Sequence, residues 1–311
     1  MSHERPRLFP HDDHAVAIVT GRHRARFLHA MTTASLTDRA PGDAGFALMA
    51  TSNGRHIGQV RFEVTADRIE LVGRQASLAA VLEGLRKHRV ADDVRWTDPA
   101  GVGLLALYGP SAAAIASAVL GPLPEGATGE LTWDGQPVRV TRIPALESEL
   151  GREALHLRLA SALAPSLRVR LLAAGAEPMD KDVWERARIE AGWPLDGDDL
   201  GTEDVALASE RLAATVSWTK GCFLGQEVYV MARDRGELPK RLRRVVTTAG
   251  AAPRGRAELV DANGKVQGVL GSAAMLPSGG WLGLAMLKRK ASEPGTELVV
   301  GEGGSRVSVT T

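Results

Sequence analysis

The pattern of hydrophobic and polar residues predicts short strands and amphipathic helices through the first hundred residues. Residues 15–19 are all apolar and predict a buried strand. Residues 22–31 follow with the spacing of a helix that packs one side against a core. Asn53 and Gly54 form a strong hairpin signal between two of the later strands. Three strands and a further helix are expected at 46–51, 57–65, 68–72 and 78–89.

The strand expected at 57–65 shows strict alternation. Val60, Phe62 and Val64 alternate with Arg61 and Glu63. Successive side chains of a strand point to opposite faces of the sheet, so the pattern predicts a half-buried strand.

A second segment begins after a boundary at 98–101, where Asp, Pro, Ala and Gly follow one another. The order of elements there is strand, helix, two strands joined at Asp134 and Gly135, then strand and helix. This order suggests a ferredoxin-like middle segment. The elements are expected at 102–107, 111–120, around 138–140, 155–159 and 162–174.

The remaining chain divides into a helix, a long connection and a strand-rich end. Residues 180–191 predict a helix with one apolar side. Residues 193–217 predict an irregular connection. Short strands with Gly-containing turns from 245 onward predict a small antiparallel barrel. Its strands are expected at 257–260, 266–270, 282–287, 298–300 and 307–310.

Composition and charge narrow the class of protein. Apolar residues make up 44% of the 311 residues, which suits a globular chain. Lys plus Arg is 38 and Asp plus Glu is 37, so no global field attracts nucleic acid or an anionic membrane. The N-terminus lacks the pattern of a signal peptide, and no apolar run is long enough to span a membrane. We therefore expect a cytoplasmic protein without a membrane partner.

The only cysteine lies in the segment 218–236. Cys222 follows Lys220 by two positions, and Gln226 and Glu227 come shortly after it on what is expected to be the same short loop. A nearby cation favours the thiolate, so Lys220 could activate the thiol. The alternative is a turn with a buried, inert cysteine. One cysteine excludes an internal disulfide and a cluster held by four thiolates of this chain.

The octapeptide from Lys220 to Glu227 resembles the KGC[YF]xGQE signature of the YgfZ family. That family binds folate and shares the fold of the glycine-cleavage T-protein. It is linked to iron–sulfur cluster assembly and tRNA modification. The Arg235-Gly236 pair also fits the signature. Met231 departs from it, because several relatives carry arginine at that place, and Arg233 could substitute.

The resemblance implies a tetrahydrofolate site. Residues 188–192 are similar to the RxEAG segment of the T-protein family, in which the glutamate binds the pterin ring of folate. Here that glutamate is Glu190, and one carboxylate can accept the paired donors of a pterin edge. Arg188, Gln226, Glu227 and Arg235 would complete the folate site. The alternative is that Glu190 has no binding role and is a solvent-exposed residue on a surface helix.

The resemblance also implies that aminomethyltransferase catalysis is lost. True aminomethyltransferases carry two aspartates after the hairpin, and here Gly58 and Gln59 stand in their place. Neither side chain can act as a general base. His56 lies nearby and is expected to be solvated. An active folate-dependent one-carbon transferase remains the alternative.

The most basic stretch spans 233–244 and contains six Lys or Arg residues but only two acidic residues, Asp234 and Glu237. It could bind the glutamate tail of folate or tRNA phosphates, the latter giving a tRNA-binding adaptor as a further alternative. A basic strand edge that discourages aggregation would explain it equally well. The cations are Arg233, Arg235, Lys240, Arg241, Arg243 and Arg244.

Together, these features predict a three-lobed α+β protein with the aminomethyltransferase-like fold. Its lobes are expected at 1–98 (antiparallel α+β), 99–239 (ferredoxin-like, with the folate signature) and 240–311 (β-barrel). The predicted function is folate binding in the assembly or repair of iron–sulfur enzymes, with Cys222 as the reactive or redox-sensing thiol. No metal site is predicted, because the acidic residues between 196 and 204 lack the spacing of a calcium loop.

Overall fold

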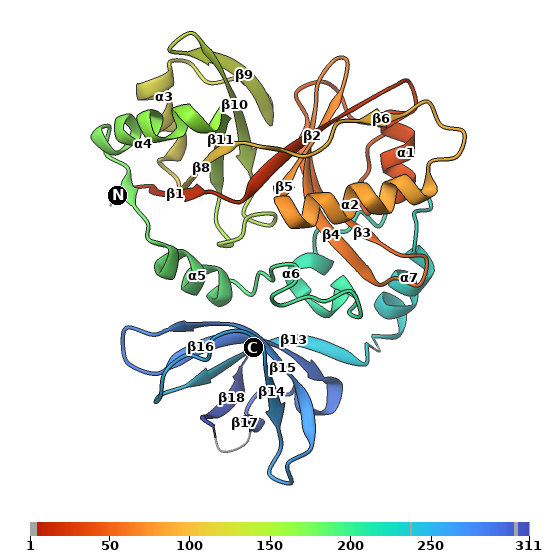
Figure 1. Ribbon diagram of the computed structural model, residues 1–311, viewed down its shortest axis with the longest axis vertical. Coiled ribbons are helices and arrows are strands. Elements are labelled where there is room, and N and C mark those ends of the chain that lie inside the picture. Colours follow the sequence, from red (N-terminus) through yellow and green to blue (C-terminus); the bar gives the residue numbers. More distant parts are fainter. Residues whose placement is uncertain (1–4, 237, 302–303, 311) are drawn as a thin grey trace. The chain divides into compact units, whose positions relative to one another are not determined.

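A computed structural model describes residues 5–236, 238–301 and 304–310 (Figure 1). Residues 1–4, which bear on the signal-peptide expectation, and Glu237 of the basic stretch lie outside the described residues. The chain forms two compact units. The first comprises Met1–Met49, Ile57–Asp180 and Thr215–Leu224, and the second comprises Ala50–His56, Lys181–Ala214 and Gly225–Thr311. The expected division at 98 and 239 stays a prediction.

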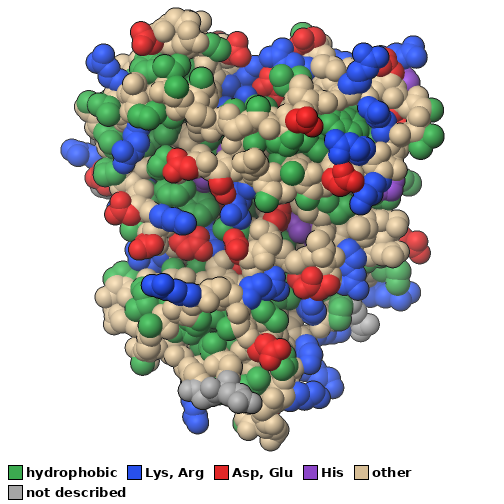
Figure 2. Space-filling model, in the orientation of Figure 1, with side chains coloured by type: hydrophobic (Ala, Val, Ile, Leu, Met, Phe, Trp, Pro, Cys, Tyr) green, Lys and Arg blue, Asp and Glu red, His purple; other side chains and the backbone are tan. Residues whose placement is uncertain are grey.

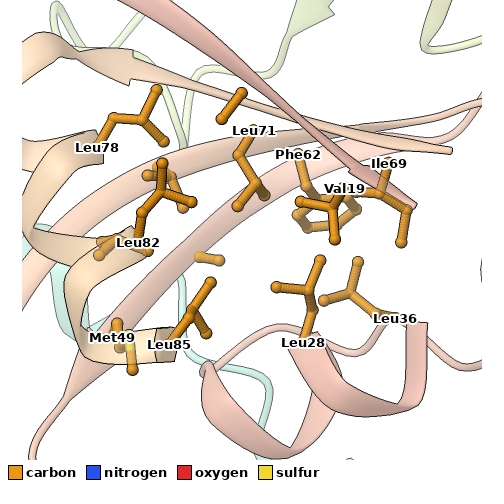
Figure 3. Packing of buried hydrophobic residues seen from close by; sticks show 14 of the residues in the cluster. Val19, Leu28, Leu36, Met49, Phe62, Ile69, Leu71, Leu78, Leu82 and Leu85 are labelled. Carbon is orange, nitrogen blue, oxygen red and sulfur yellow. The ribbon is translucent and has the colours of Figure 1, made fainter. Parts of the chain in front are cut away.

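One sheet of the first unit has the order β3-β4-β5-β2-β6, with β7 also paired to β2. Helices α1 (Arg24–Met31) and α2 (Gln75–His88) pack on one of its faces. Figure 3 shows Leu78, Leu82 and Leu85 of α2 meeting the side chains of the sheet. The strands are β2 (His14–Thr20), β3 (Ala44–Ala50), β4 (His56–Val64), β5 (Ile69–Arg74), β6 (Arg95–Trp96) and β7 (Ala100–Gly101).

The other sheet of this unit has the order β12-β1-β8-β11-β10-β9. Helices α3 (Ala112–Leu120) and α4 (Ala164–Ala173), the latter preceded by the short η1 (Ser161–Leu163), cover one face. The expected order of strands and helices is present. Strand β1, which was not expected, joins this sheet by pairing with β8. The strands are β1 (Arg7–His11), β8 (Gly103–Tyr108), β9 (Thr128–Trp133), β10 (Gln136–Ile143), β11 (Ala154–Leu159) and β12 (Glu177–Pro178).

Polar side chains fill the space between these two sheets. Glu63 and Glu70 are 4% and 3% exposed, and Arg158 from the other sheet bonds to both, reaching Glu63 Oε2 at 2.6 Å. Burial raises the pKa of Glu70, but Arg158 and Arg139 outweigh it and hold that pKa below its usual value. Strand β4 is therefore buried on both faces, which corrects the half-buried strand expected from its alternation.

The second unit begins with α5 (Lys181–Glu190), close to the expected helix. The following connection was expected to be irregular, but it contains two short helices, η2 (Ala206–Ala208) and α6 (Glu210–Ala213). Ser209 caps α6 by accepting a hydrogen bond from the Leu212 N–H at 3.3 Å. Helix α7 (Gln226–Arg235) precedes the barrel.

The barrel expected at the end of the chain is confirmed. Six antiparallel strands close in the order β13-β16-β15-β14-β17-β18 around Trp281, Leu270 and their apolar neighbours. The first strand begins at Lys240, so part of the basic stretch belongs to the barrel wall. The strands are β13 (Lys240–Thr247), β14 (Ala257–Val260), β15 (Val266–Met275), β16 (Trp281–Lys288), β17 (Glu297–Val300) and β18 (Arg306–Thr310), with the short η3 (Arg289–Ala291) after β16.

The surface carries charges of both signs. On the face shown in Figure 2, basic and acidic side chains are interspersed, in keeping with the net charge of +1. Among the described residues, no helix is long and apolar enough to cross a membrane.

Candidate functional site

Residues 217–224 form a strap along the end of α1 in the first unit. The Ser217 N–H donates to the Thr33 carbonyl at 3.1 Å, and the Leu224 N–H donates to the Ala30 carbonyl at 2.9 Å. Between these anchors, the Lys220 ammonium donates to three backbone carbonyls. They are those of His29, Thr32 (2.6 Å) and Ala34 (2.8 Å).

Lys220 is therefore a helix-capping cation. The last carbonyls of a helix lack partners within the helix and carry partial negative charge, which an ammonium satisfies. The side chain is 9% exposed, and burial lowers its pKa to about 8. The three donors of Lys220 are directed to carbonyl oxygens, and its role toward the thiol of Cys222 stays a prediction.

Cys222 lies between the two anchored ends of the strap and is exposed. Its neighbour Phe223 points the other way and is 7% exposed, with the Lys220 ammonium 5.1 Å from the centre of its ring. The alternative of a buried, inert cysteine does not apply. The reactivity of the thiol stays a prediction.

Gln226 and Glu227 form the first turn of α7, not a loop as expected. Gly225 precedes them with φ of 80°, and a Cβ there would collide with the Thr51 carbonyl oxygen, so only glycine fits. Glu227 is exposed, and so is Arg235 at the other end of the helix. These three predicted folate ligands belong to the second unit, whereas Cys222 and Lys220 belong to the first.

Arg188 is fully buried within the second unit. Its guanidinium bonds to Asp199 Oδ2 at 2.6 Å, to the Trp193 carbonyl at 3.2 Å, and to the Glu185 carboxylate. Burial lowers the pKa of Arg188, but Asp199 and Glu185 outweigh it and raise that pKa. Arg188 joins α5 to the segment after it, and its contact with folate stays a prediction.

Glu190 differs from Arg188 although both come from the same turn of α5. Its side chain is exposed and lines a cavity of about 250 Å³ within the second unit. Apolar walls come from Leu242 and Leu284. The charged groups around the cavity are Glu190, Glu210, Arg211, Arg243 and Arg244.

The arginines of this cavity are fixed by neighbouring oxygen atoms. Arg243 Nη1 lies 3.0 Å from Glu210 Oε1, and Arg244 Nη1 donates to the Glu190 carbonyl at 2.7 Å. The Glu190 side chain thus lines a cavity that also holds three arginines and Glu210, and its own backbone carbonyl holds one of those arginines, Arg244. This arrangement can accept hydrogen bonds from a donor pair and can also contact an anionic group.

The basic stretch does not form one surface. Lys240 and Arg244 alternate with Arg241 and Arg243 along β13, so the cations point to opposite faces of the barrel wall. Lys240 pairs with Asp204 at 2.8 Å, and Arg233 pairs with Asp234 at 2.7 Å. Much of the expected charge is neutralised locally.

Gly58 is one of the two positions that correspond to the aspartates of the aminomethyltransferases, and its surroundings are crowded. A Cβ on Gly58 would lie 2.9 Å from Ser77 Oγ and 2.9 Å from Val81 Cγ2, both on α2. A side chain at position 58 would therefore require the side chains of Ser77 and Val81 to move. Gln59 is the other position, and it supplies no carboxylate.

His56 was expected to be solvated, but it is 2% exposed. Its Nε2 lies 2.7 Å from Asp196 Oδ1. This His–Asp pair lies within the second unit and was missed, because 140 residues separate the two partners. The only signal in the sequence was the density of acidic residues after 195.

The fold defines an aminomethyltransferase-like class of protein, and three comparisons agree. The GCVT N-terminal domain matches residues 8–220, more than half of the chain. An aminomethyltransferase of Frankia alni is 32% identical over 291 residues, covering 90% of this chain and 77% of that protein. The chain therefore belongs to the GCVT family.

Two further relatives bear on which member of the family this chain resembles. A chloroplastic protein of Arabidopsis thaliana, named among the transferases, is 30% identical over 91% of this chain, which spans 66% of that protein. The tRNA-modifying protein YgfZ of Yersinia enterocolitica is 26% identical, covering 78% of this chain and 71% of that protein. The expected family-level relationship is confirmed, and the finer YgfZ assignment rests on this lower identity.

The fold is also that of a solved structure. The glycine cleavage system aminomethyltransferase T of Bartonella henselae matches with a TM-score of 0.80 and 20% identity, covering 99% of this chain and 85% of that one. The expected α+β, aminomethyltransferase-like fold class is confirmed.

Proposed function

We propose that this chain binds a reduced folate through Glu190 and works in the assembly or repair of iron–sulfur enzymes, as a cytoplasmic YgfZ-type protein. The observation that carries the proposal is the exposed Glu190 carboxylate at a cavity with arginines around it. It combines a bidentate acceptor with apolar walls, which is the usual make-up of a small-molecule site.

The size of the cavity limits what it can hold. Small-molecule sites commonly measure about 300–1,000 Å³, and this cavity of about 250 Å³ falls just below that range. It suits a fused ring rather than a whole folate. The remainder of the ligand would extend beyond the cavity, and Arg235, Gln226 and Glu227 of α7 stay its predicted contacts.

Aminomethyl transfer is not proposed because the hairpin lacks its carboxylates. Gly58 carries no side chain and a Cβ there would crowd Ser77 and Val81, and Gln59 is not a base at neutral pH. Cys222 supplies an exposed thiol instead, which is compatible with exchange of sulfur, redox equivalents or a cluster with a client protein.

Calorimetric titration of tetrahydrofolate into the full-length chain tests the proposal. Replacing Glu190 with Gln keeps its size but removes the charge that accepts the donor pair, so affinity should fall by about ten- to a hundredfold. Glu210→Gln is the matched control, since Glu210 lines the same cavity and its carboxylate is already engaged by Arg243. Equal affinities for wild type and Glu190→Gln would overturn the proposal.

The alternative of an active transferase has one observation in its favour. The His56–Asp196 pair lies at the hairpin where the family carries its aspartates, and an imidazole held by a carboxylate can act as a base. Folate-dependent release of the aminomethyl group, abolished by His56→Gln and Asp196→Asn, would establish this alternative.

A tRNA-binding adaptor has weaker support, because the cations of β13 point to both faces of the strand. Tight, salt-sensitive tRNA binding that Glu190→Gln leaves intact would favour it.

A further inference from the structure

Three metal-ligating side chains meet where the chain passes from β1 to β2 in the first unit. His11 ends β1, His14 begins β2, and Asp13 lies in the link between them. One ligating atom from each lies within 4.8 Å of the others. We infer that His11, Asp13 and His14 bind a divalent transition metal ion of the Zn²⁺ type.

The spacing suits such an ion. Zn²⁺ takes nitrogen and oxygen ligands at about 2.0–2.2 Å, so two of its ligands stand roughly 3–3.5 Å apart. His14 Nδ1 and Asp13 Oδ1 are 3.0 Å apart, and the rings of His11 and His14 have centroids 4.7 Å apart. All three ligating atoms lie within 4.8 Å of one another, so binding an ion would require the side chains to draw closer together.

Outer partners hold two of the ligands in place. The Tyr108 hydroxyl lies 3.1 Å from His11 Nε2 and fixes the orientation of that ring. Arg74 Nε donates to Asp13 Oδ2 at 2.6 Å, which leaves Oδ1 directed toward His14. Hydrogen bonds of this kind orient ligands in known metal sites.

A second observation supports a ligand beside His11. His156 on β11 is 4% exposed, and its ring centroid is 5.9 Å from that of His11. Its Nε2 has no hydrogen-bond partner among the described residues. Buried polar atoms are nearly always satisfied, so an ion with a bound water beside His11 would supply the partner that His156 lacks.

The donor set defines the class of metal. Two imidazoles with one carboxylate favour Zn²⁺, Ni²⁺ or Co²⁺ over Mg²⁺ and Ca²⁺, which prefer oxygen ligands. The Asp13 side chain is 52% exposed and gives the ion access from solvent. Three protein ligands leave further coordination positions for water or a small anion.

Metal titration of untagged, chelator-treated full-length protein tests the inference. Calorimetry with Zn²⁺ should give one ion per chain, and Co²⁺ should develop the visible absorption of a nitrogen- and oxygen-ligated site. His14→Ala and Asp13→Asn should each weaken Zn²⁺ binding by about tenfold or more. Asp13 is half exposed, so Asp13→Asn reports on the site even where His14→Ala does not fold.

Two controls exclude other metal-binding groups. Cys222→Ser removes the exposed thiol, and His88→Ala removes an exposed histidine at the end of α2. Both should bind Zn²⁺ as the wild type does. Absence of Zn²⁺ binding by the wild type, unchanged binding by Asp13→Asn, or loss of binding in Cys222→Ser would overturn the inference.

Discussion

Lys220 and Glu190 both belong to segments that resemble family signatures, yet they occupy opposite environments. Lys220 is 9% exposed and caps α1 through three carbonyls. Glu190 is exposed and lines a cavity. The first residue holds the first unit together, and the second is available to a ligand. A match to a family motif therefore does not by itself say whether a residue stabilises the fold or is available to a ligand. The burial and the contacts of the side chain distinguish these two roles.

The same contrast appears within a single turn of α5. Arg188 is buried against Asp199, whereas Glu190, two residues later, lies at the surface. Residues two apart on a helix point in very different directions, so a short motif can combine a structural residue with a binding residue.

The largest effect is expected for Arg188→Met. This change leaves the fully buried Asp199 carboxylate without its charged partner, which should cost about 3–5 kcal/mol of unfolding free energy. Arg186→Met, on the same helix but partly exposed, is the control. Denaturant unfolding measures both, and a loss below about 1 kcal/mol for Arg188→Met would show that the pair is not a structural element.

Lys220→Met should come next, with a loss of about 2–3 kcal/mol, because three carbonyls at the end of α1 lose their donor. The exposed Lys87→Met at the end of α2 should change stability by less than about 0.5 kcal/mol. Should Lys220→Met keep its stability but slow the alkylation of Cys222, the lysine would serve the thiol after all.

Cys222→Ser should have the smallest effect on stability, within about 0.5 kcal/mol, since the side chain is exposed. In the folded wild type, Cys222 should react with iodoacetamide without prior unfolding. Protection of the thiol until denaturant is added would contradict its placement on the outside of the strap.

Local patterns predicted most of the strands and helices. The barrel strand β14 falls at the expected 257–260, and the Asn53-Gly54 turn joins β3 to β4 as expected. These features depend on residues close in sequence, where turn chemistry and periodicity act directly. The connection after α5 was less predictable, because its short helices depend on caps such as Ser209 rather than on a long periodic pattern.

Contacts between residues that are far apart in the chain could not be predicted from the sequence. The alternation of Arg61 and Glu63 with apolar residues gave the correct faces of β4, but not the second sheet that covers the polar face. Likewise, His56 needs Asp196, and Lys220 needs the carbonyls of residues 29–34. Such partners become visible only when distant segments have been brought together.

Thermal unfolding with and without tetrahydrofolate tests the contrast between Lys220 and Glu190 most directly, because it reports stability and binding together. Glu190→Gln should unfold at the wild-type temperature without ligand and lose most of the rise that tetrahydrofolate produces. Lys220→Met should unfold at a lower temperature and keep that rise. A wild-type response to folate in Glu190→Gln, or its loss in Lys220→Met with the unfolding temperature unchanged, would contradict the assigned roles.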